Sequence, residues 1–221
     1  MPIAFFDLDK TLLEINSARL WMRWQRKQHR ITVWQTLQAS YWLTLYHLGV
    51  TGVEAAIRKA VRYNFTGANQ KETLLQVQQF YMQELYNKYR PKALQVLQQQ
   101  RALGHRLVLL TSALHELAEL VTQQLHLDSC LCTHLQVDNA GNYTGQVMEP
   151  MCFGQGKLKL AQEFAQQNDV QLQDCLFYTD SVWDLPLLQQ VGSPVVVNPD
   201  PNLRRQAKRQ GWPIEDWGKA A

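Results

Sequence analysis

The chain has 221 residues, 46% of them hydrophobic, so it is long enough to bury a core, and its composition excludes a disordered tail protein. The net charge is +3, from 22 basic and 19 acidic residues, and the near-terminal basic run at residues 204–209 is typical of a solvated helix face. We therefore expect no nucleic-acid partner.

The chain opens with a short apolar run, PIAFF at residues 2–6, which favours a β-strand and ends at Asp7. A secretory leader needs a basic start and a longer apolar stretch, whereas here Asp7 and Asp9 follow at once. We therefore expect a cytoplasmic protein. Because disulfides are rare in the cytoplasm, its four cysteines are expected to be reduced thiols.

Residues 16–89 contain no strand-like run and have the pattern of successive amphipathic helices rich in Trp, Tyr, Leu and Gln. One piece, residues 31–50, has about the length of a membrane span of roughly twenty residues. Five polar side chains interrupt it: Gln35, Gln38, Ser40, Thr44 and His47. A packed or interfacial helix is therefore favoured, and no membrane span is predicted.

After residue 90, strand-like and helical stretches alternate. Helical periodicity is found at residues 91–105, 113–127 and 156–170, and continuous apolar runs at residues 106–111, 175–180 and 194–198. Apolar runs without alternation are typical of strands buried on both faces of a parallel sheet. The order predicts βαβ units in an open α/β sheet, with a β-hairpin at residues 133–147 around a Gly/Asn turn.

Cys130 and Cys132 form a CxC pair, with His126 and His134 close by in the sequence, and this raises the question of zinc. Zinc-binding sequences usually combine two matched pairs of ligands, and no second pair is found here. We therefore expect no zinc site.

Polar side chains follow the expected strands at their carboxyl ends: Asp7 and Asp9, Thr111 and Ser112, and Asp180 and Asp184. Lys157 opens a helix after the glycines of GQGK. Each residue alone is typical of a helix cap or a solvated helix. Because ligands of open parallel sheets bind at the carboxyl ends of the strands, the joint occurrence favours one functional site.

Carboxylates that lie close together raise one another's pKa unless a cation lies among them, and hard oxygen ligands suit Mg²⁺. The set therefore predicts a Mg²⁺ site. For a phosphate ester the other groups also have uses: a carboxylate as nucleophile, an acid for the leaving oxygen, and a hydroxyl and a lysine to bind phosphoryl oxygens.

FFDLDKT at residues 5–11 resembles the DxDxT signature of the haloacid dehalogenase superfamily. LVLLT, the lysine of GQGK and TDSVWD resemble its second, third and fourth motifs in the same order, and the chain is most similar to the phosphoserine-phosphatase-like members of subfamily IB. The resemblance implies a Rossmann-like core of residues 1–15 and 90–221, and an inserted helical-bundle cap of the C1 type at residues 16–89.

The resemblance also implies roles. Asp7 would attack phosphorus to form an aspartyl-phosphate, and Asp9 would protonate the leaving alcohol and later activate water. Asp7, the backbone carbonyl of Asp9, and Asp180 would hold Mg²⁺. Asp184 would orient the lysine or reach the ion through water.

For the substrate, the resemblance implies that Thr111 and Ser112 bind phosphoryl oxygens and that Lys157 neutralises charge. Trp183 stands where phosphoserine phosphatases usually carry an Asn, and TSAL lacks their Gly-Gly pair. An aromatic ring cannot make the hydrogen bonds of an Asn, which argues against phosphoserine specificity. We therefore assign Trp183 to substrate binding.

The segment at residues 16–89 is rich in aromatic side chains: Trp21, Trp24, Trp34, Tyr41, Trp42 and Tyr46, with Arg62. Packing inside a helical bundle accounts for any one of them. Should one or two line the site, an aromatic, heterocyclic or quaternary-ammonium substrate becomes the expectation.

We therefore predict a Mg²⁺-dependent phosphomonoester hydrolase of a small organic phosphate. Two alternatives stay open: a phosphotransferase or phosphomutase of the same superfamily, and a non-catalytic binding or membrane-surface protein that contacts lipid through residues 31–50. The required residue type at every predicted catalytic position favours an enzyme. The oligomeric state is not predicted.

Overall fold

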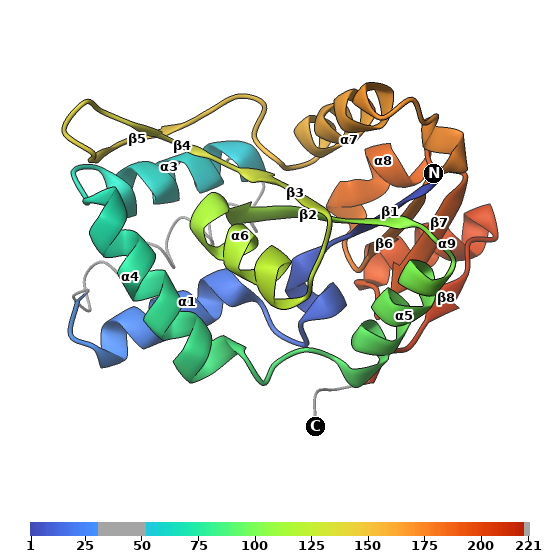
Figure 1. Ribbon diagram of the computed structural model, residues 1–221, viewed down its shortest axis with the longest axis horizontal. Coiled ribbons are helices and arrows are strands. Elements are labelled where there is room, and N and C mark those ends of the chain that lie inside the picture. The colour runs from blue at the N-terminus through green and yellow to red at the C-terminus, as the bar shows by residue number, and fades with distance from the viewer. Residues whose placement is uncertain (31–51, 219–221) are drawn as a thin grey trace.

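A computed structural model describes residues 1–30 and 52–218, and a six-stranded parallel sheet forms its centre (Figure 1). The strand order is β3-β2-β1-β6-β7-β8. These strands are β1 (Ile3–Phe6), β2 (Arg106–Leu114), β3 (Ser129–Thr133), β6 (Leu176–Thr179), β7 (Ser193–Val197) and β8 (Ile214–Glu215). Every pairing in the sheet is parallel, which confirms the predicted α/β fold.

Helices cover both faces of the sheet, and β1 shows how. Ala4 and Phe6 point into the hydrophobic cluster on one face, and Ile3 and Phe5 into the cluster on the other. One face is covered by α5 (Pro91–Ala102) and α6 (His115–Gln124), the other by α7 (Gln155–Gln167), α8 (Leu185–Leu188) and α9 (Pro201–Gln210). Because successive side chains of a strand face opposite sides, a strand between two helical layers must be apolar throughout.

Two features of the sheet differ from the expectation. β3 and β8 lie at the edges and lack a continuous apolar run, so the sequence pattern did not indicate them. β2 extends to Leu114, and α6 therefore begins at His115 rather than at residue 113. The predicted hairpin is present as β4 (Leu135–Val137) and β5 (Tyr143–Val147), which pair antiparallel.

The helices of the inserted segment lie together at the left of Figure 1: α1 (Ser17–Lys27), α3 (Val53–Phe65) and α4 (Gln70–Phe80), which continues through a π-helical turn at Tyr81–Leu85. Trp24 is buried among them, with its ring centroid 5.3 Å from that of Trp21 and 5.8 Å from that of Phe80. Its indole N–H donates to Gln83 at 2.8 Å. Trp24 is therefore a packing residue.

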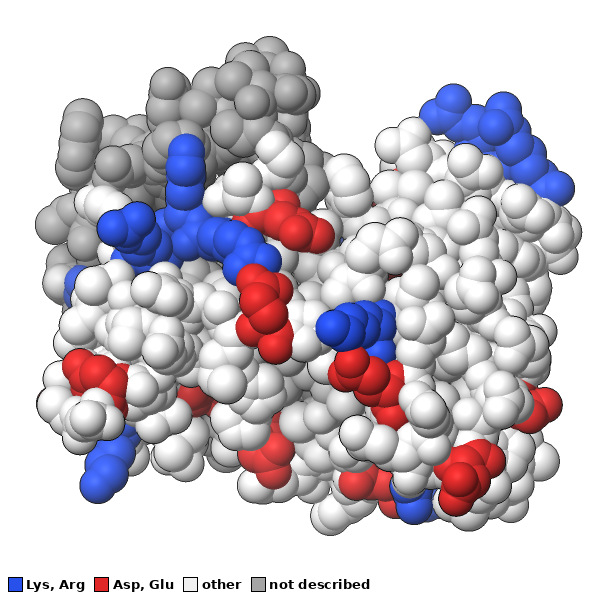
Figure 2. All heavy atoms as spheres, turned by 90° about the horizontal axis from the view of Figure 1, so that it is seen from above, with Lys and Arg blue, Asp and Glu red and all other residues white. Residues whose placement is uncertain are grey.

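The prediction for residues 31–50, with Trp34, Tyr41, Trp42 and Tyr46, lies outside the described residues. In the parts of the chain that are described, every helix is too short or too polar to cross a membrane. On the face shown in Figure 2, the described basic side chains stand in small separate groups, some of them next to acidic side chains, and the described residues form no continuous basic surface there.

The β4–β5 hairpin packs against α3, where Val61, Leu135 and Tyr143 form a small buried cluster. The Tyr143 hydroxyl donates a hydrogen bond to Glu116 of α6. The hairpin thus extends the packing of the inserted helices onto the core. The division into residues 1–15 with 90–221 and residues 16–89 remains a prediction.

The two segments that connect the inserted helices to the core lie side by side. Leu13 forms an antiparallel bridge with Tyr89. The backbone N–H of Glu14 donates to Lys88 O at 3.0 Å, and that of Arg90 donates to Leu12 O at 2.9 Å. The entry and exit of the insert are therefore hydrogen-bonded to each other.

Candidate active site

Asp7 directly follows β1, and its backbone N–H donates to the carbonyl of Tyr178 in β6 at 2.9 Å. The chain then turns through Leu8–Leu12, where Lys10 adopts a left-handed φ of 58°. Non-glycine residues rarely occupy this region, and those that do are often part of a functional turn. The turn places both Asp7 and Asp9 at the carboxyl edge of the sheet.

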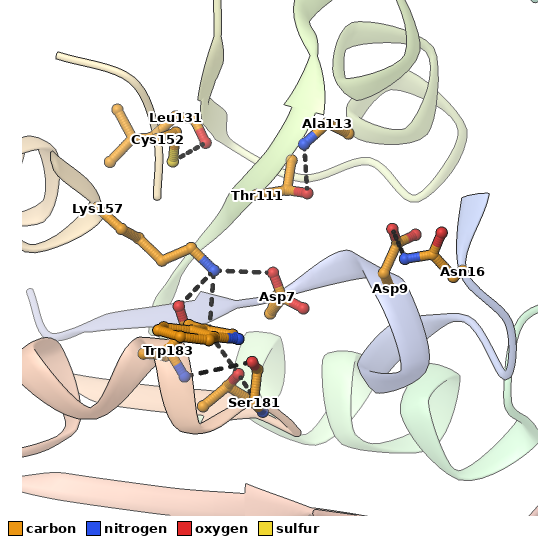
Figure 3. Close-up of polar contacts among 12 residues, drawn as sticks. Asp7, Asp9, Asn16, Thr111, Ala113, Leu131, Cys152, Lys157, Ser181 and Trp183 are labelled. Atoms are coloured by element: carbon orange, nitrogen blue, oxygen red, sulfur yellow. Dashed lines mark hydrogen bonds and ion pairs between the residues drawn. The ribbon is translucent and has the colours of Figure 1, made fainter. Parts of the chain in front are cut away.

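Lys157 lies between two carboxylates from different strand ends (Figure 3). Its Nζ is 2.9 Å from Asp7 Oδ1 and 2.9 Å from Asp184 Oδ1. Asp184 also accepts a 2.5 Å hydrogen bond from the hydroxyl of Thr179. Lys157, Asp7 and Asp184 are all buried, so these contacts form in a region of low dielectric. The two acids raise the pKa of Lys157 against the effect of burial, which keeps the ammonium charged.

A close approach of the backbone positions Lys157. Gly156 lies in the first turn of α7, and a Cβ at this position would lie 2.0 Å from the carbonyl oxygen of Met151. Only glycine fits there. The glycine of GQGK that precedes the lysine thus lets the start of α7 reach the sheet edge.

Burial raises the pKa of Asp7 to about 7, with Lys157 lowering it and Asp184 raising it. Burial also raises the pKa of Asp180 to about 8, helped by the negative charge of Asp7. Within residues 1–30 and 52–218, the carboxylate of Asp180 accepts no hydrogen bond and pairs with no cation. Two buried acids that repel each other fit a hard divalent cation such as Mg²⁺.

The carboxylate of Asp9 points toward α1 rather than toward Lys157 (Figure 3). Its Oδ1 accepts from the backbone N–H of Ser17 at 2.9 Å, and its Oδ2 accepts from the amide of Asn16 at 3.1 Å. Burial raises the pKa of Asp9, and the bond from Ser17 lowers it. Asp9 thus connects the sheet edge to the first residues of the inserted helices.

The three remaining predicted residues differ in exposure. Thr111 is buried, and its hydroxyl accepts from the backbone N–H of Ala113 at 3.1 Å. Ser112 is exposed. Trp183 is 42% exposed, and its ring centroid lies 5.8 Å from that of Phe153. Since Trp183 immediately precedes the buried Asp184, it lies at the rim of the site.

Two residues that support the site were not predicted. Asp200 accepts from the backbone N–H of Val182 at 2.7 Å, caps the start of α9, and its own N–H donates to Asp180 O at 2.9 Å. Arg90 is buried, and its Nη2 donates to Lys10 O at 3.3 Å. Asp200 has a recognisable signal, because an Asp directly before Pro201 is a typical helix N-cap. Arg90 has none in its local sequence.

A family model described as haloacid dehalogenase-like hydrolase matches residues 4–189. The range includes every predicted site residue. Phosphoserine phosphatase SerB1 of Mycobacterium tuberculosis is 30% identical over 219 residues, which cover 97% of this chain and 70% of the relative.

A histidinol-phosphatase of Neisseria meningitidis is 27% identical over 221 residues, which cover 96% of this chain and 97% of the relative. Among solved structures, a protein of unknown function from Bordetella pertussis has a TM-score of 0.88 at 24% identity and covers 98% of this chain and 99% of its own. This last likeness concerns the fold alone.

Proposed function

Because the chain belongs to the haloacid dehalogenase-like hydrolase family and is a phosphatase like its relatives, we propose that it hydrolyses phosphate monoesters of small organic molecules with Mg²⁺ as cofactor. The observation that carries this proposal is the buried contact of Lys157 with both Asp7 and Asp184. Buried ion pairs often stabilise a fold no better than apolar residues of the same size, so a catalytic use accounts for the arrangement better.

Asp7 is the proposed nucleophile. Lys157 holds its Oδ1, and its Oδ2 accepts no hydrogen bond from the described residues. We propose that Oδ2 attacks phosphorus while the bond from phosphorus to the leaving alcohol breaks, and that water then hydrolyses the resulting aspartyl-phosphate. An ionised carboxylate needs no base to activate it, and a nearby cation favours its ionised form.

Asp9 is the proposed acid for the leaving alcohol and the base for the attacking water. Its raised pKa favours the protonated form that the first of these steps requires. Thr111, Ser112 and Lys157 are proposed to bind the phosphoryl oxygens.

Asp7, Asp180 and the backbone carbonyl of Asp9 would hold the Mg²⁺, with Asp184 orienting Lys157 or reaching the ion through water. When bound, the ion supplies positive charge that stabilises the phosphoryl oxygens in the transition state.

The direct test is release of phosphate from p-nitrophenyl phosphate and from a panel of metabolite phosphates, with added Mg²⁺ and with EDTA. Hydrolysis predicts equal amounts of phosphate and alcohol, and loss of both in EDTA. Equal rates with and without EDTA would contradict the Mg²⁺ proposal. Alcohol release in excess of phosphate, with an acceptor alcohol present, would instead indicate a phosphotransferase.

Trp183 points to a substrate with a ring. One relative is named a phosphoserine phosphatase and another a histidinol-phosphatase. Phosphoserine has no ring, whereas histidinol phosphate carries an imidazole. The partly exposed indole of Trp183 beside Phe153 offers an aromatic surface at the rim of the site. We therefore propose an aromatic or heterocyclic phosphate ester as the preferred substrate class.

Trp183→Asn is expected to lower kcat/KM for histidinol phosphate relative to that for phosphoserine by about 2–10-fold, because one aromatic contact contributes about 0.5–1.5 kcal/mol. Trp183→Phe keeps an aromatic ring and should keep the ratio. Steady-state kinetics on both substrates measure it. An unchanged ratio of the two kcat/KM values in Trp183→Asn would exclude Trp183 as a determinant of substrate specificity.

The Mg²⁺-free protein is expected to lose stability as the pH rises from about 4 to about 8. Asp7 and Asp180 have raised pKa values, so the folded state binds their protons more tightly than the unfolded chain does, and deprotonation destabilises the fold. A loss of ~2 kcal/mol corresponds to a fall in Tm of about 4–8 °C for a chain of this size. Thermal unfolding in EDTA across this range measures the fall.

Added Mg²⁺ should restore more stability at pH 8 than at pH 5, because protons compete with the ion for the same oxygens. Asp180→Asn should weaken both the pH dependence and the Mg²⁺ effect. A Tm in EDTA that rises steadily up to pH 8 would contradict the proposed arrangement of charges.

A further inference from the structure

We propose that the chain has a second metal site, for one Zn²⁺ ion, formed by His115, Cys132 and His134. These residues come from the start of α6, from β3 and from the residue that follows β3. None of them belongs to the acidic site around Asp7, and their imidazole and thiol groups are ligands for a softer ion than Mg²⁺.

The distances match a zinc polyhedron. Cys132 Sγ is 3.8 Å from His115 Nδ1 and 3.6 Å from His134 Nε2. With Zn–S near 2.3 Å and Zn–N near 2.0–2.1 Å, a regular tetrahedron has a sulfur-to-nitrogen edge of about 3.5 Å. The three ligand atoms all lie within 4.8 Å of one another. A small rotation of the side chains is therefore enough to place the three atoms around one ion.

The fold explains why these residues meet. Positions 130, 132 and 134 have the same parity, so Cys130, Cys132 and His134 point to the same side of the extended chain. His115 and Glu119 are four residues apart on α6 and lie on one face of that helix. The helix α6 and the strand β3 place these two sets of side chains opposite each other. His115 also belongs to a second group of possible metal ligands, together with Glu119 and Cys130.

The sequence lacks a second pair of zinc ligands near Cys130 and Cys132. We propose that His115, from the neighbouring helix α6, provides the additional ligand. The CxC spacing led to the expectation of no zinc site, because His115 lies 17 residues before Cys132 and so is not part of the local pattern. His126, which is close to the cysteines in sequence, is in neither group of ligands.

The surroundings allow an ion to enter and to keep a water molecule. Cys132 is buried, His115 is half-buried and His134 is exposed, so the cluster runs from the core to the surface. It borders a hollow of about 630 Å³ that is lined by polar side chains, among them Glu119 and Gln123.

The rings of His115 and His134 are also stacked, with centroids 4.6 Å apart and an angle of 25° between their planes. The Glu119 carboxylate lies within 4.8 Å of a His115 ring nitrogen, so the cluster also has a hard oxygen ligand within reach. Metal binding accounts for all three positions. A bound ion would join α6 to β3 and would stabilise the fold.

The test is a titration of the full chain with Co²⁺ and then Zn²⁺, in a reducing buffer with Mg²⁺ saturating. We expect one equivalent of Co²⁺ to give a thiolate-to-cobalt charge-transfer band that Zn²⁺ then removes, and a higher Tm in Zn²⁺. Saturating Mg²⁺ occupies the acidic site, and a charge-transfer band requires a sulfur ligand.

His134→Asn changes an exposed residue and should keep the fold, and Cys132→Ser replaces the thiol that lies near both histidines. Each is expected to weaken Zn²⁺ binding by at least about 10-fold, since even changes outside the ligand shell cost ~10–100-fold. His126→Asn is the matched control: His126 lines the same hollow at a left-handed φ of 52°, which Asn tolerates, and binding should be unchanged.

Absence of the cobalt band in the native chain, or equal affinity in His134→Asn and the native chain, would overturn the site. Loss of the cobalt band in the control His126→Asn, to the same extent as in His134→Asn, would also overturn the site. Phosphatase activity is not a readout here, so failure of the zinc site and failure of the proposed catalytic function are distinguishable.

Discussion

Asp7→Asn is expected to lower kcat for phosphate release by at least about 10³-fold, because the variant lacks the carboxylate that we propose as the nucleophile. The amide has nearly the same size and shape, so the packing around Asp7 is kept. The raised pKa of Asp7 means that the fold does not favour its charge, and the Tm should therefore stay the same or rise. Kinetics and thermal unfolding on the same preparation separate the two effects.

Asp169→Asn is the matched control. Asp169 is exposed and has a left-handed φ of 55°, a conformation that Asn adopts as readily as Asp. Its activity and Tm should equal those of the native chain. More than a tenth of native activity in Asp7→Asn would exclude Asp7 as the nucleophile.

Lys157→Met is expected to lower the free energy of unfolding by about 3–5 kcal/mol in EDTA, since it leaves Asp7 and Asp184 buried without their shared cation. Met has a similar length and fills the same space. The activity should fall as well, because we propose that the ammonium stabilises charge on the transferred phosphoryl group. Urea unfolding measures the first effect and phosphate release the second.

Lys159→Met makes the same change two residues later on α7. Lys159 is exposed, and its contact with Glu163 at 3.8 Å is a surface ion pair. Such pairs contribute little, so we expect a change within about 0.5 kcal/mol and full activity. Similar stability of the two variants would show that the buried lysine is not needed to hold the two acids.

The fold could be predicted where burial leaves a strong pattern. β1, β6 and β7 are covered on both faces, and each is a continuous apolar run that the sequence indicates directly. β3 and β8 are edge strands and carry no such pattern. The first three residues of SCLCT are only partly buried, so the strand has no continuous apolar run, and its tertiary contacts rather than its local sequence determine that it pairs.

The site could be predicted as a set of residues but not as a set of contacts. Strand ends converge in any parallel sheet, which is why Asp7, Thr111 and Asp180 could be assigned to one edge. The contact of Lys157 with Asp7 joins positions 150 residues apart, and no local pattern encodes it. The orientation of Asp9 toward Ser17 was equally inaccessible, because it depends on where α1 begins.

The cluster of His115, Cys132 and His134 also shows that local sequence does not predict contacts between distant segments. Local spacing around Cys130 and Cys132 argued against zinc, and the fold then brought His115 to them from α6. Sequence spacing describes ligands that share one segment. It gives no information about a side chain such as His115, which a neighbouring helix places beside that segment.

The paired connection between the insert and the core restricts how the insert can move. Leu13 and Tyr89 are bridged, and the backbone groups beside them are hydrogen-bonded, so sliding one connecting segment along the other would break these bonds. Asp9 lies four residues before Leu13, and its carboxylate accepts from the backbone N–H of Ser17 in α1. Any displacement of α1 relative to the sheet would therefore change the surroundings of Asp9.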